Sequence, residues 1–325
     1  MGICTQNREE GEDSMKREDF TFESRDNQTK LHAVRWEPDE GISPVGILVI
    51  VHGMSEHVDR YEDFASFMTG HGFIVTADDH LGHGKSAVDG KYGYFCKQDP
   101  ATVVVRDVHR LKKITQEMFP GLPVFILGHS MGSFILRNYL FRYGKGIDGA
   151  IVMGTGMPPK AVAGALKFTS SVGCLFGKSE KPSNFINNMG FGSYNKKIAN
   201  PRTGYDWLTT VDSVVDKYIA DPECGFVFTC NGFKTLAELI LRLHKKDNLE
   251  KMPVTLPVFF ASGADDPVGD YGEAVKKVYK SFVDEGMQKV EMKLYEGDRH
   301  EILNEKDKET VYEDIYGWIR KTMEQ

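Results

Sequence analysis

The sequence predicts an α/β protein with a mostly parallel central sheet, helices on both faces of that sheet, and one long insertion. Short apolar runs alternate along the chain with segments of helical periodicity, which is typical of strand–helix–strand units. Most of these runs lack polar–apolar alternation, as expected for strands that are covered on both faces. The alternation of strands and helices stops between residues 157 and 250, which indicates the insertion.

The expected elements follow one another in a regular order. An antiparallel pair is expected first, in DFTFES (19–24) and KLHAVRWEP (30–38). Buried strands are then expected at 46–51, 72–78, 123–128, 149–154 and 257–262, and a last strand at 289–297. The spacing of apolar residues predicts helices at 101–118, 131–143 and 271–284, and a closing amphipathic helix at 305–323.

The insertion defines the expected domains. Between residues 157 and 250, glycine, asparagine, serine and aromatic residues mix with short helical stretches. A segment of that length between two sheet strands is too long for a simple loop. We therefore predict a cap, or lid, over residues 157–250 and an α/β core formed by residues 18–156 and 251–325. The polar, acidic residues 1–17 are expected to form a disordered tail.

Composition and charge exclude several classes of protein. The 325-residue chain has a formal net charge of −7 and no basic cluster that offsets it, which argues against nucleic acid as a partner. The longest dense apolar run, VGILVIV at 45–51, is too short to span a bilayer. The N-terminus lacks the apolar core of a signal peptide, and the five cysteines have neither metal-binding nor redox spacing. We therefore expect a cytoplasmic protein with free thiols.

Ser130 is the candidate nucleophile. It lies in GHSMG (128–132), where the apolar run PVFILG ends and a helical pattern begins. A G-x-S-x-G sequence between a strand and a helix holds its serine out above the sheet, and the two glycines keep the strand and helix backbones free of colliding side chains. A serine at this position could also cap the helix. The strand–turn–helix context favours the nucleophile.

A serine hydroxyl needs a general base, and the base needs an acid that orients it. In this arrangement the acid and then the histidine follow the serine along the chain. His300 is the only histidine after the strand expected at 257–262. Among the acids of GADDPVGDYG (263–272), Asp266 is favoured because Pro267 stiffens its turn, and Asp265 is the alternative. Asp270 is expected to cap the next helix.

Two backbone N–H groups are expected to stabilise the oxyanion of a tetrahedral intermediate. Met131 supplies one because it directly follows Ser130. Met54 supplies the other because it lies in the His-Gly turn after the strand expected at 46–51.

Two other motifs are not interpreted as binding sites. GHGKS (82–86) ends like a phosphate-binding loop, but Asp79 stands where that loop requires its first glycine. The acids and histidines of DDHLGH (78–83) are joined by no further set of metal ligands. A hydrogen-bonded loop is expected there.

Five motifs, taken in order, resemble the monoacylglycerol lipase and lysophospholipase branch of the α/β-hydrolase superfamily, especially its bacterial members. They are HGMSEHVDRYEDF, DDHLGHGKS, GHSMG, GADDPVG and RHEILNE. The resemblance covers roughly residues 45–156 and 257–320 and implies the α/β-hydrolase fold. Carried over by position, it implies Ser130 as nucleophile, Asp266 as acid, His300 as base, and Met54 and Met131 as oxyanion donors. It also implies that Glu56 and Arg60, four apart at the start of an expected helix, form a charged pair that braces the oxyanion turn.

The leading hypothesis is a serine carboxylester hydrolase. It would cleave monoacylglycerol-like, lysophospholipid-like or other medium-chain esters through an acyl-enzyme, with no metal or cofactor. One alternative is a proline-type aminopeptidase or amidase with the same triad, for which the cap offers Glu180, Asp206, Asp212 and Asp216 as amine ligands. Another is a non-catalytic binding protein on the same fold. The lid segment 164–182 mixes apolar residues with three lysines, which predicts transient rather than stable contact with a membrane surface.

Overall fold

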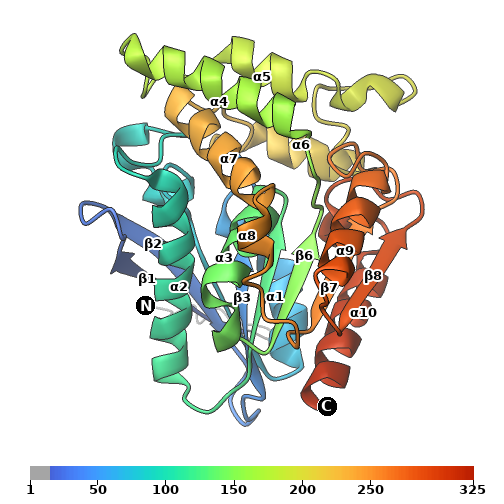
Figure 1. Cartoon of the computed structure of the whole chain (residues 1–325). Helices are drawn as coiled ribbons and strands as arrows, with labels where there is room; N and C mark the ends of the chain where they lie inside the picture. The colour runs from blue at the N-terminus through green and yellow to red at the C-terminus, as the bar shows by residue number, and fades with distance from the viewer. Residues whose placement is uncertain (1–14) are drawn as a thin grey trace, which may run out of the picture.

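The computed structural model describes residues 15–325, which form one eight-stranded sheet with helices on both faces and a helical layer above one edge (Figure 1). Residues 1–14, most of the tail expected over 1–17, lie outside the described residues. The first strand begins at Lys16, so Lys16 and Arg17 pair with the second strand instead of preceding the fold.

The strands match the expected order along the chain. Their bounds are β1 Lys16–Glu23, β2 Lys30–Glu37, β3 Gly46–Val51, β4 Phe73–Asp78, β5 Val124–His129, β6 Gly149–Met153, β7 Val258–Gly263 and β8 Val290–Tyr295. Across the sheet they are arranged β1-β2-β4-β3-β5-β6-β7-β8. The pairs β1–β2 and β2–β4 are antiparallel, and all the others are parallel. The expected opening pair and mostly parallel sheet are thus confirmed.

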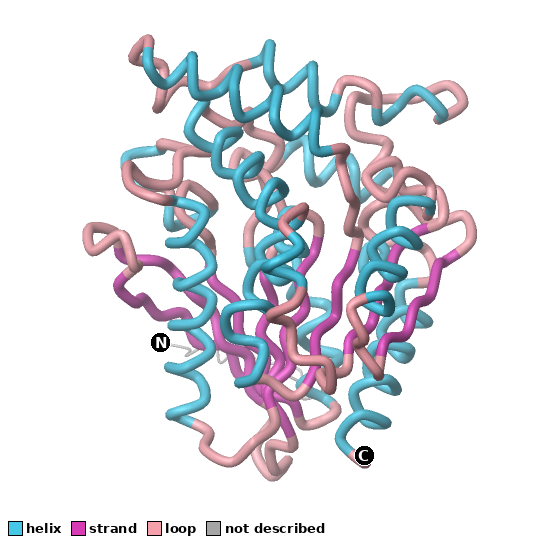
Figure 2. The backbone as a smooth tube through the Cα atoms, in the orientation of Figure 1, coloured by secondary structure: helices cyan, strands magenta, loops and turns pink. Residues whose placement is uncertain are grey.

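Ten helices of the described chain surround or cover this sheet (Figure 2). Those that follow core strands are α1 Glu62–Gly70, α2 Pro100–Met118, α3 Met131–Tyr143, α9 Glu273–Asp284 and α10 Lys308–Met323. Those between β6 and β7 are α4 Lys160–Leu175, α5 Asn184–Phe191, α6 Asp212–Ala220, α7 Cys230–Leu243 and α8 Lys246–Leu249.

The inner strands are buried because each of their two faces has its own core. In β3, Ile47 and Val49 belong to the core that includes α2, α3 and α9. Leu48 and Ile50 belong to the core on the opposite face, with α1 and α10. Side chains of a strand point alternately to the two faces, so a strand covered on both sides needs apolar residues at every position. This explains the continuous apolar runs in the sequence.

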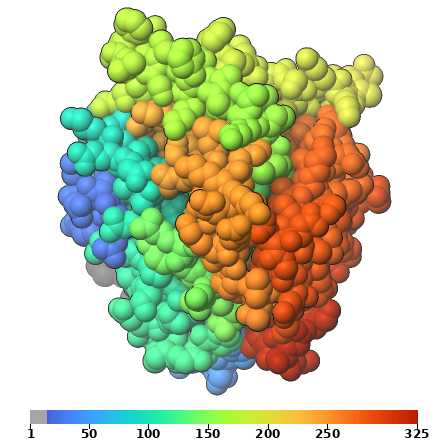
Figure 3. Space-filling view, viewed as in Figure 1, coloured from blue at the N-terminus to red at the C-terminus, as the bar shows by residue number. Residues whose placement is uncertain are grey.

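The segment between β6 and β7 forms the expected layer above the carboxyl ends of the strands. Helix α4 packs against α7, and α7 packs against α3. Phe233 and Leu239 of α7 are buried in the same core as α3, so α7 anchors this layer to the sheet. In Figure 3, residues of α4 and α5 form the yellow-green rim across the top of the molecule. No helix within residues 15–325 has the length and apolar character needed to cross a membrane.

Candidate active site

Ser130 occupies a strained turn between β5 and α3. Its backbone dihedrals are φ 54° and ψ −118°, and a non-glycine residue with positive φ is strained in the manner often found at functional sites. A Cβ on Gly132 would lie 1.9 Å from the carbonyl oxygen of Val51, and one on Gly128 would lie 2.5 Å from the carbonyl oxygen of Gly132. Both glycines are therefore required for the close approach of β3, β5 and α3 that holds the turn.

His300 and Asp266 form a buried pair. Nδ1 of His300 lies 2.9 Å from Oδ2 of Asp266, and Oδ1 of Asp266 accepts a hydrogen bond of 2.8 Å from the backbone N–H of Val268. Both side chains are almost fully buried, whereas Asp265 and Asp270 are exposed. The loop after β7 thus directs only one of its three carboxylates toward His300.

The expectation that Asp270 caps a helix is wrong for its side chain. Helix α9 begins at Glu273, its N-cap is Gly272, and no side chain accepts a hydrogen bond at that end. The backbone carbonyl of Asp270 accepts from the N–H of Glu273 instead. A left-handed turn at Asp270, Tyr271 and Gly272 separates the carboxylate from the helix end.

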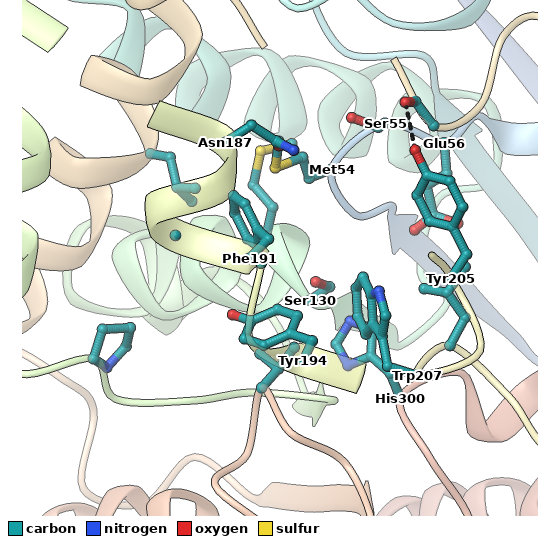
Figure 4. Close-up of a pocket in the computed structure, with 18 of the residues that line it drawn as sticks. Met54, Ser55, Glu56, Ser130, Asn187, Phe191, Tyr194, Tyr205, Trp207 and His300 are labelled. Carbon is teal, nitrogen blue, oxygen red and sulfur yellow. Dashed lines mark hydrogen bonds between the residues drawn. The ribbon is translucent and has the colours of Figure 1, made fainter. Parts of the chain in front are cut away.

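Ser130 and His300 line the same cavity (Figure 4). The hydrogen bonds among residues 15–325 include none between the Ser130 hydroxyl and His300, and such contacts are often loose in enzymes without substrate. Trp207 of the cap lies beside the base, with its ring centroid 5.1 Å from that of His300. The backbone N–H of His300 also donates to the Trp207 carbonyl at 3.4 Å. A cap residue therefore helps to fix the histidine.

The two expected oxyanion donors belong to residues that line the same cavity as Ser130. Met131 is the first residue of α3, where N–H groups have no partner within the helix. Met54 lies in the turn after β3, which we call the oxyanion turn (residues 53–57). In that turn the N–H of Gly53 donates to Oε1 of Glu56 at 2.5 Å, and Ser55 has a positive φ of 56°. Met54 and Met131 both line the cavity that contains Ser130.

A buried array of charges lies beneath the oxyanion turn. Arg60 donates to Oε2 of Glu56 at 2.8 Å and to both carboxylate oxygens of Glu301 at 2.7 and 2.6 Å. Glu56 also accepts from the Tyr61 hydroxyl at 2.9 Å and faces Nδ1 of His129 at 3.2 Å. Glu56 and Arg60 thus brace the turn, as the resemblance implies.

Burial and the neighbouring charges shift the pKa values of Glu56 and His129 in opposite directions. Burial on its own would raise the pKa of Glu56, but the hydrogen bond from His129 and the charges of His129 and Arg60 hold that pKa well below its usual value. Burial would lower the pKa of His129, yet Glu56 raises it. Nε2 of His129 faces the carbonyl oxygen of His300 at 3.2 Å. The array therefore connects the oxyanion turn with the loop that carries the histidine.

Sequence reasoning did not identify Glu301, His129 or Tyr61 as parts of this array. Glu301 directly follows His300, and His129 directly precedes Ser130. Their positions next to two candidate catalytic residues were the only sequence signal that could have identified them. Glu56 itself precedes the single 3₁₀ turn Val58–Tyr61 and does not begin a helix.

The cavity that contains Ser130 has a volume of about 500 Å³. Its apolar lining includes Phe134, Leu166, Phe191, Leu208, Leu236 and Ile240, which come from both the core and the cap. Among the described residues, Glu56 and Glu301 are the only carboxylates that line it, and Arg60 is bonded to both. The four cap acids considered as amine ligands do not line it. Asp206 instead accepts from the backbone N–H of Thr203, and Asp216 from Arg202.

The DDHLGH segment forms a hydrogen-bonded loop, as expected. The carboxylate of Asp79 accepts from the N–H of Val58 at 3.0 Å and of Lys85 at 3.0 Å, and it pairs with Nδ1 of His32 at 2.8 Å. The ring of His80 stacks on that of His52, with centroids 3.9 Å apart. This loop supports Val58, the residue that follows the oxyanion turn, and the ring of His83 packs against Phe226 and Phe228 of the cap.

The sheet order, the strained serine turn, the buried acid–histidine pair and the covering cap define an α/β-hydrolase. The model of the family described as serine aminopeptidase, S33, matches residues 42–307. The chain belongs to this family, and it is a hydrolase.

Comparisons with known proteins agree with this assignment. The chain is 29% identical to a monoacylglycerol lipase of Mycolicibacterium smegmatis over 287 residues, which cover 87% of this chain and 90% of that protein. It is 27% identical to the monoglyceride lipase of Mus musculus, over 87% of this chain and 84% of the mouse protein. The crystal structure of a thermostable carboxyl esterase from Bacillus coagulans superposes with a TM-score of 0.87 at 33% identity, covering 95% of this chain and 99% of the esterase.

Proposed function

We propose that this protein is a serine carboxylester hydrolase that cleaves monoacylglycerol-like, lysophospholipid-like or other medium-chain esters. The observation that carries the proposal is the mostly apolar cavity of about 500 Å³ that contains Ser130 and His300. Cavities of this size and character bind small molecules, and an acyl chain matches the apolar lining. The names of the relatives, which are lipases and an esterase, support the same substrate class.

In this proposal Ser130, His300 and Asp266 act in sequence. Oγ of Ser130 attacks the acyl carbonyl carbon while Nε2 of His300 takes the hydroxyl proton. Asp266, already bonded to Nδ1, fixes the tautomer and stabilises the imidazolium.

The N–H groups of Met54 and Met131 would donate to the developing oxyanion. His300 then gives its proton to the departing alcohol, which leaves Ser130 acylated. Water attacks the acyl-enzyme by the same route, and its proton passes through His300 back to Ser130.

The test compares Ser130→Ala with the wild type on p-nitrophenyl esters of increasing chain length and on amino-acid p-nitroanilides. We expect the wild type to hydrolyse the medium-chain esters, and Ser130→Ala to lose both this turnover and labelling by a fluorophosphonate probe. Retained ester turnover in Ser130→Ala would overturn the assignment of the nucleophile. Exclusive turnover of the amides would favour the aminopeptidase, and a wild type that is neither labelled nor active would favour a binding protein.

We also propose transient contact between the cap and a lipid surface. Apolar side chains on α4 and α5 and in the loop between them are strongly exposed, notably Phe168, Leu175, Phe176 and Phe185. The net negative charge of the chain is unevenly distributed, because residues 157–204 contain seven basic residues and one acidic residue. An apolar surface with basic residues around it suits a membrane that contains anionic lipid.

Sedimentation with vesicles tests this contact. The wild type should pellet with phosphatidylglycerol vesicles more than with phosphatidylcholine vesicles, and the double variant Leu175→Ser/Phe176→Ser should pellet less. Val283→Ser removes an exposed apolar side chain from α9, at the surface of the core domain, and is the matched control. Equal pelleting of all three proteins would refute the contact.

A further inference from the structure

Three possible metal ligands meet outside the cavity, where the oxyanion turn contacts the cap. They are a ring nitrogen of His57, a carboxylate oxygen of Asp221 and Sγ of Cys224, and these three atoms all lie within 4.8 Å of one another. His57 ends the oxyanion turn, whereas Asp221 and Cys224 belong to the cap loop between α6 and α7. Nε2 of His57 is 2.9 Å from Oδ2 of Asp221. The described residues contain no other cluster of three such groups.

The chemistry of these groups suits a borderline-soft divalent cation. Imidazole nitrogen, thiolate sulfur and carboxylate oxygen are the ligands that Zn²⁺ takes in proteins, whereas Mg²⁺ prefers oxygen alone. We propose that His57, Asp221 and Cys224 bind a Zn²⁺ ion, with water as the fourth ligand. His57 and Cys224 are buried, and the Asp221 side chain is 32% exposed, so the ion and its water reach the site from the side of Asp221.

The neighbours of the three ligands fit this role. Oδ2 of Asp59 lies 4.0 Å from Nδ1 of His57, on the far side of the ring from Asp221. This distance is too long for a hydrogen bond, so Asp59 contributes a nearby negative charge but does not orient the imidazole as a hydrogen-bonded outer partner would. The positive charge of Arg60 is balanced by Glu56 and Glu301. Zn²⁺ binding would displace the thiol proton of Cys224 to solvent and replace the hydrogen bond between His57 and Asp221.

The position of the site gives it a structural consequence. Three hydrogen bonds already tie Ser55 to the cap. Its carbonyl accepts from Gly225 N–H and from the Tyr218 hydroxyl, each at 3.0 Å, and its own hydroxyl donates to the Phe226 carbonyl at 2.7 Å. The hydrogen bond between His57 and Asp221 is a fourth link between the same two segments, and a metal ion bound at His57, Asp221 and Cys224 would replace it with metal–ligand bonds. The site therefore connects the cap to the oxyanion turn, and its existence does not depend on which substrate the enzyme cleaves.

The experiment uses the full-length protein after removal of metals with a chelator. ZnCl2 should bind with a stoichiometry of one per chain in competition with a chromophoric chelator and should raise Tm, whereas MgCl2 should not. CoCl2 should produce thiolate-to-cobalt charge-transfer absorption, which only a cysteine ligand gives. Cys224→Ser should abolish this absorption and weaken Zn²⁺ binding by at least about 10²-fold, more than the loss of an outer partner costs.

Two further variants keep the result interpretable. Asp221→Asn alters a partly exposed ligand, so it is expected to fold and should also weaken binding. Cys96→Ser is the matched control, because Cys96 is as buried as Cys224, at 7% against 8% exposure, but belongs to no ligand cluster among residues 15–325. Absence of stoichiometric Zn²⁺ binding in the wild type would overturn the proposal. Unchanged Zn²⁺ affinity in both Cys224→Ser and Asp221→Asn would do the same.

Discussion

The Arg60→Met variant tests the buried charge array most directly. Arg60 joins Glu56 to Glu301, and the side chains of the three residues are only 12%, 5% and 4% exposed. Methionine is long and unbranched, so it fills much of the same space but carries no charge. The substitution therefore leaves two buried carboxylates without their shared cation. Glu56 keeps hydrogen bonds from Gly53 and Tyr61 and its contact with His129. Within residues 15–325, Glu301 keeps only the side-chain amide of Asn304 at 3.2 Å.

The expected loss of stability follows from this arrangement. Removing one partner of a buried ion pair costs about 3–5 kcal/mol, because a charge stays buried without compensation. An unfolding entropy of about 2.1 cal/mol/K per residue gives roughly 0.7 kcal/mol per degree for a chain of 325 residues. The variant should therefore melt about 4–7 °C below the wild type.

Differential scanning calorimetry at neutral pH provides the assay, and Arg202→Met provides the control. Arg202 also lies between two carboxylates, Asp212 and Asp216, but its side chain is 44% exposed. Water and salt screen such a pair, so Arg202→Met should leave Tm unchanged. The triple variant Arg60→Met/Glu56→Gln/Glu301→Gln should recover part of the loss. The reasoning is refuted if the Tm of Arg60→Met equals that of the wild type. It is also refuted if Arg202→Met lowers Tm as much as Arg60→Met does.

Three further predictions concern the proposed site and the pH dependence of stability. Asp266→Asn should lower kcat for p-nitrophenyl esters by about 10⁴, because it leaves the wrong histidine tautomer, and the exposed neighbour variant Asp265→Asn should not. Met131→Ala should keep kcat within the same order of magnitude, since the proposed donor is its backbone N–H; a loss as large as that of Ser130→Ala would contradict this role. Burial raises the pKa of Asp107 from 3.8 to about 7, so the stability present below pH 4 is lost as pH rises toward 7, by up to about 1.4 kcal/mol per pH unit. Asp107→Asn should flatten this slope in urea unfolding, and an unchanged slope would refute it.

The sheet could be predicted because its signal is local. A strand covered on both faces is a continuous apolar run, and each of the inner strands was expected within one or two residues of its observed bounds. A helix was expected to start at Glu56, but helix α1 begins at Glu62. Its bounds could not be predicted because EDFASFMTG is short and its apolar face appears only against α10 and the sheet. The arrangement of helices α4 to α8 could not be predicted either. It depends on α7 packing into the main core, which links residues about a hundred positions apart, such as Asn138 and Leu239.

The choice between Asp266 and Asp265 marks the limit of sequence reasoning at the site. Asp265 and Asp266 are adjacent and chemically identical, so the sequence around them barely separates them. The one local reason to favour Asp266 was that Pro267 follows it and stiffens the turn. The structure distinguishes them by direction: one side chain is fully buried against His300 and the other is exposed. That difference depends on a contact across 34 positions, which composition and periodicity do not encode.

The charge array shows why residues that hold a site together are harder to predict than residues that line it. Ser130 and His300 occupy turns whose local sequence already indicates chemistry. The pair of Arg60 with Glu56, four positions apart, could be inferred from the sequence, but the contact of Arg60 with Glu301, 241 positions away, could not. This contact sets the distance between the oxyanion turn and the histidine loop, and the same contact contributes to global stability. Because Arg60 holds the carboxylate of Glu56, which in turn accepts from the N–H of Gly53, loss of Arg60 should loosen the oxyanion turn as well as lower Tm. Activity and stability should therefore decline together at Arg60, whereas at Ser130 activity should decline alone.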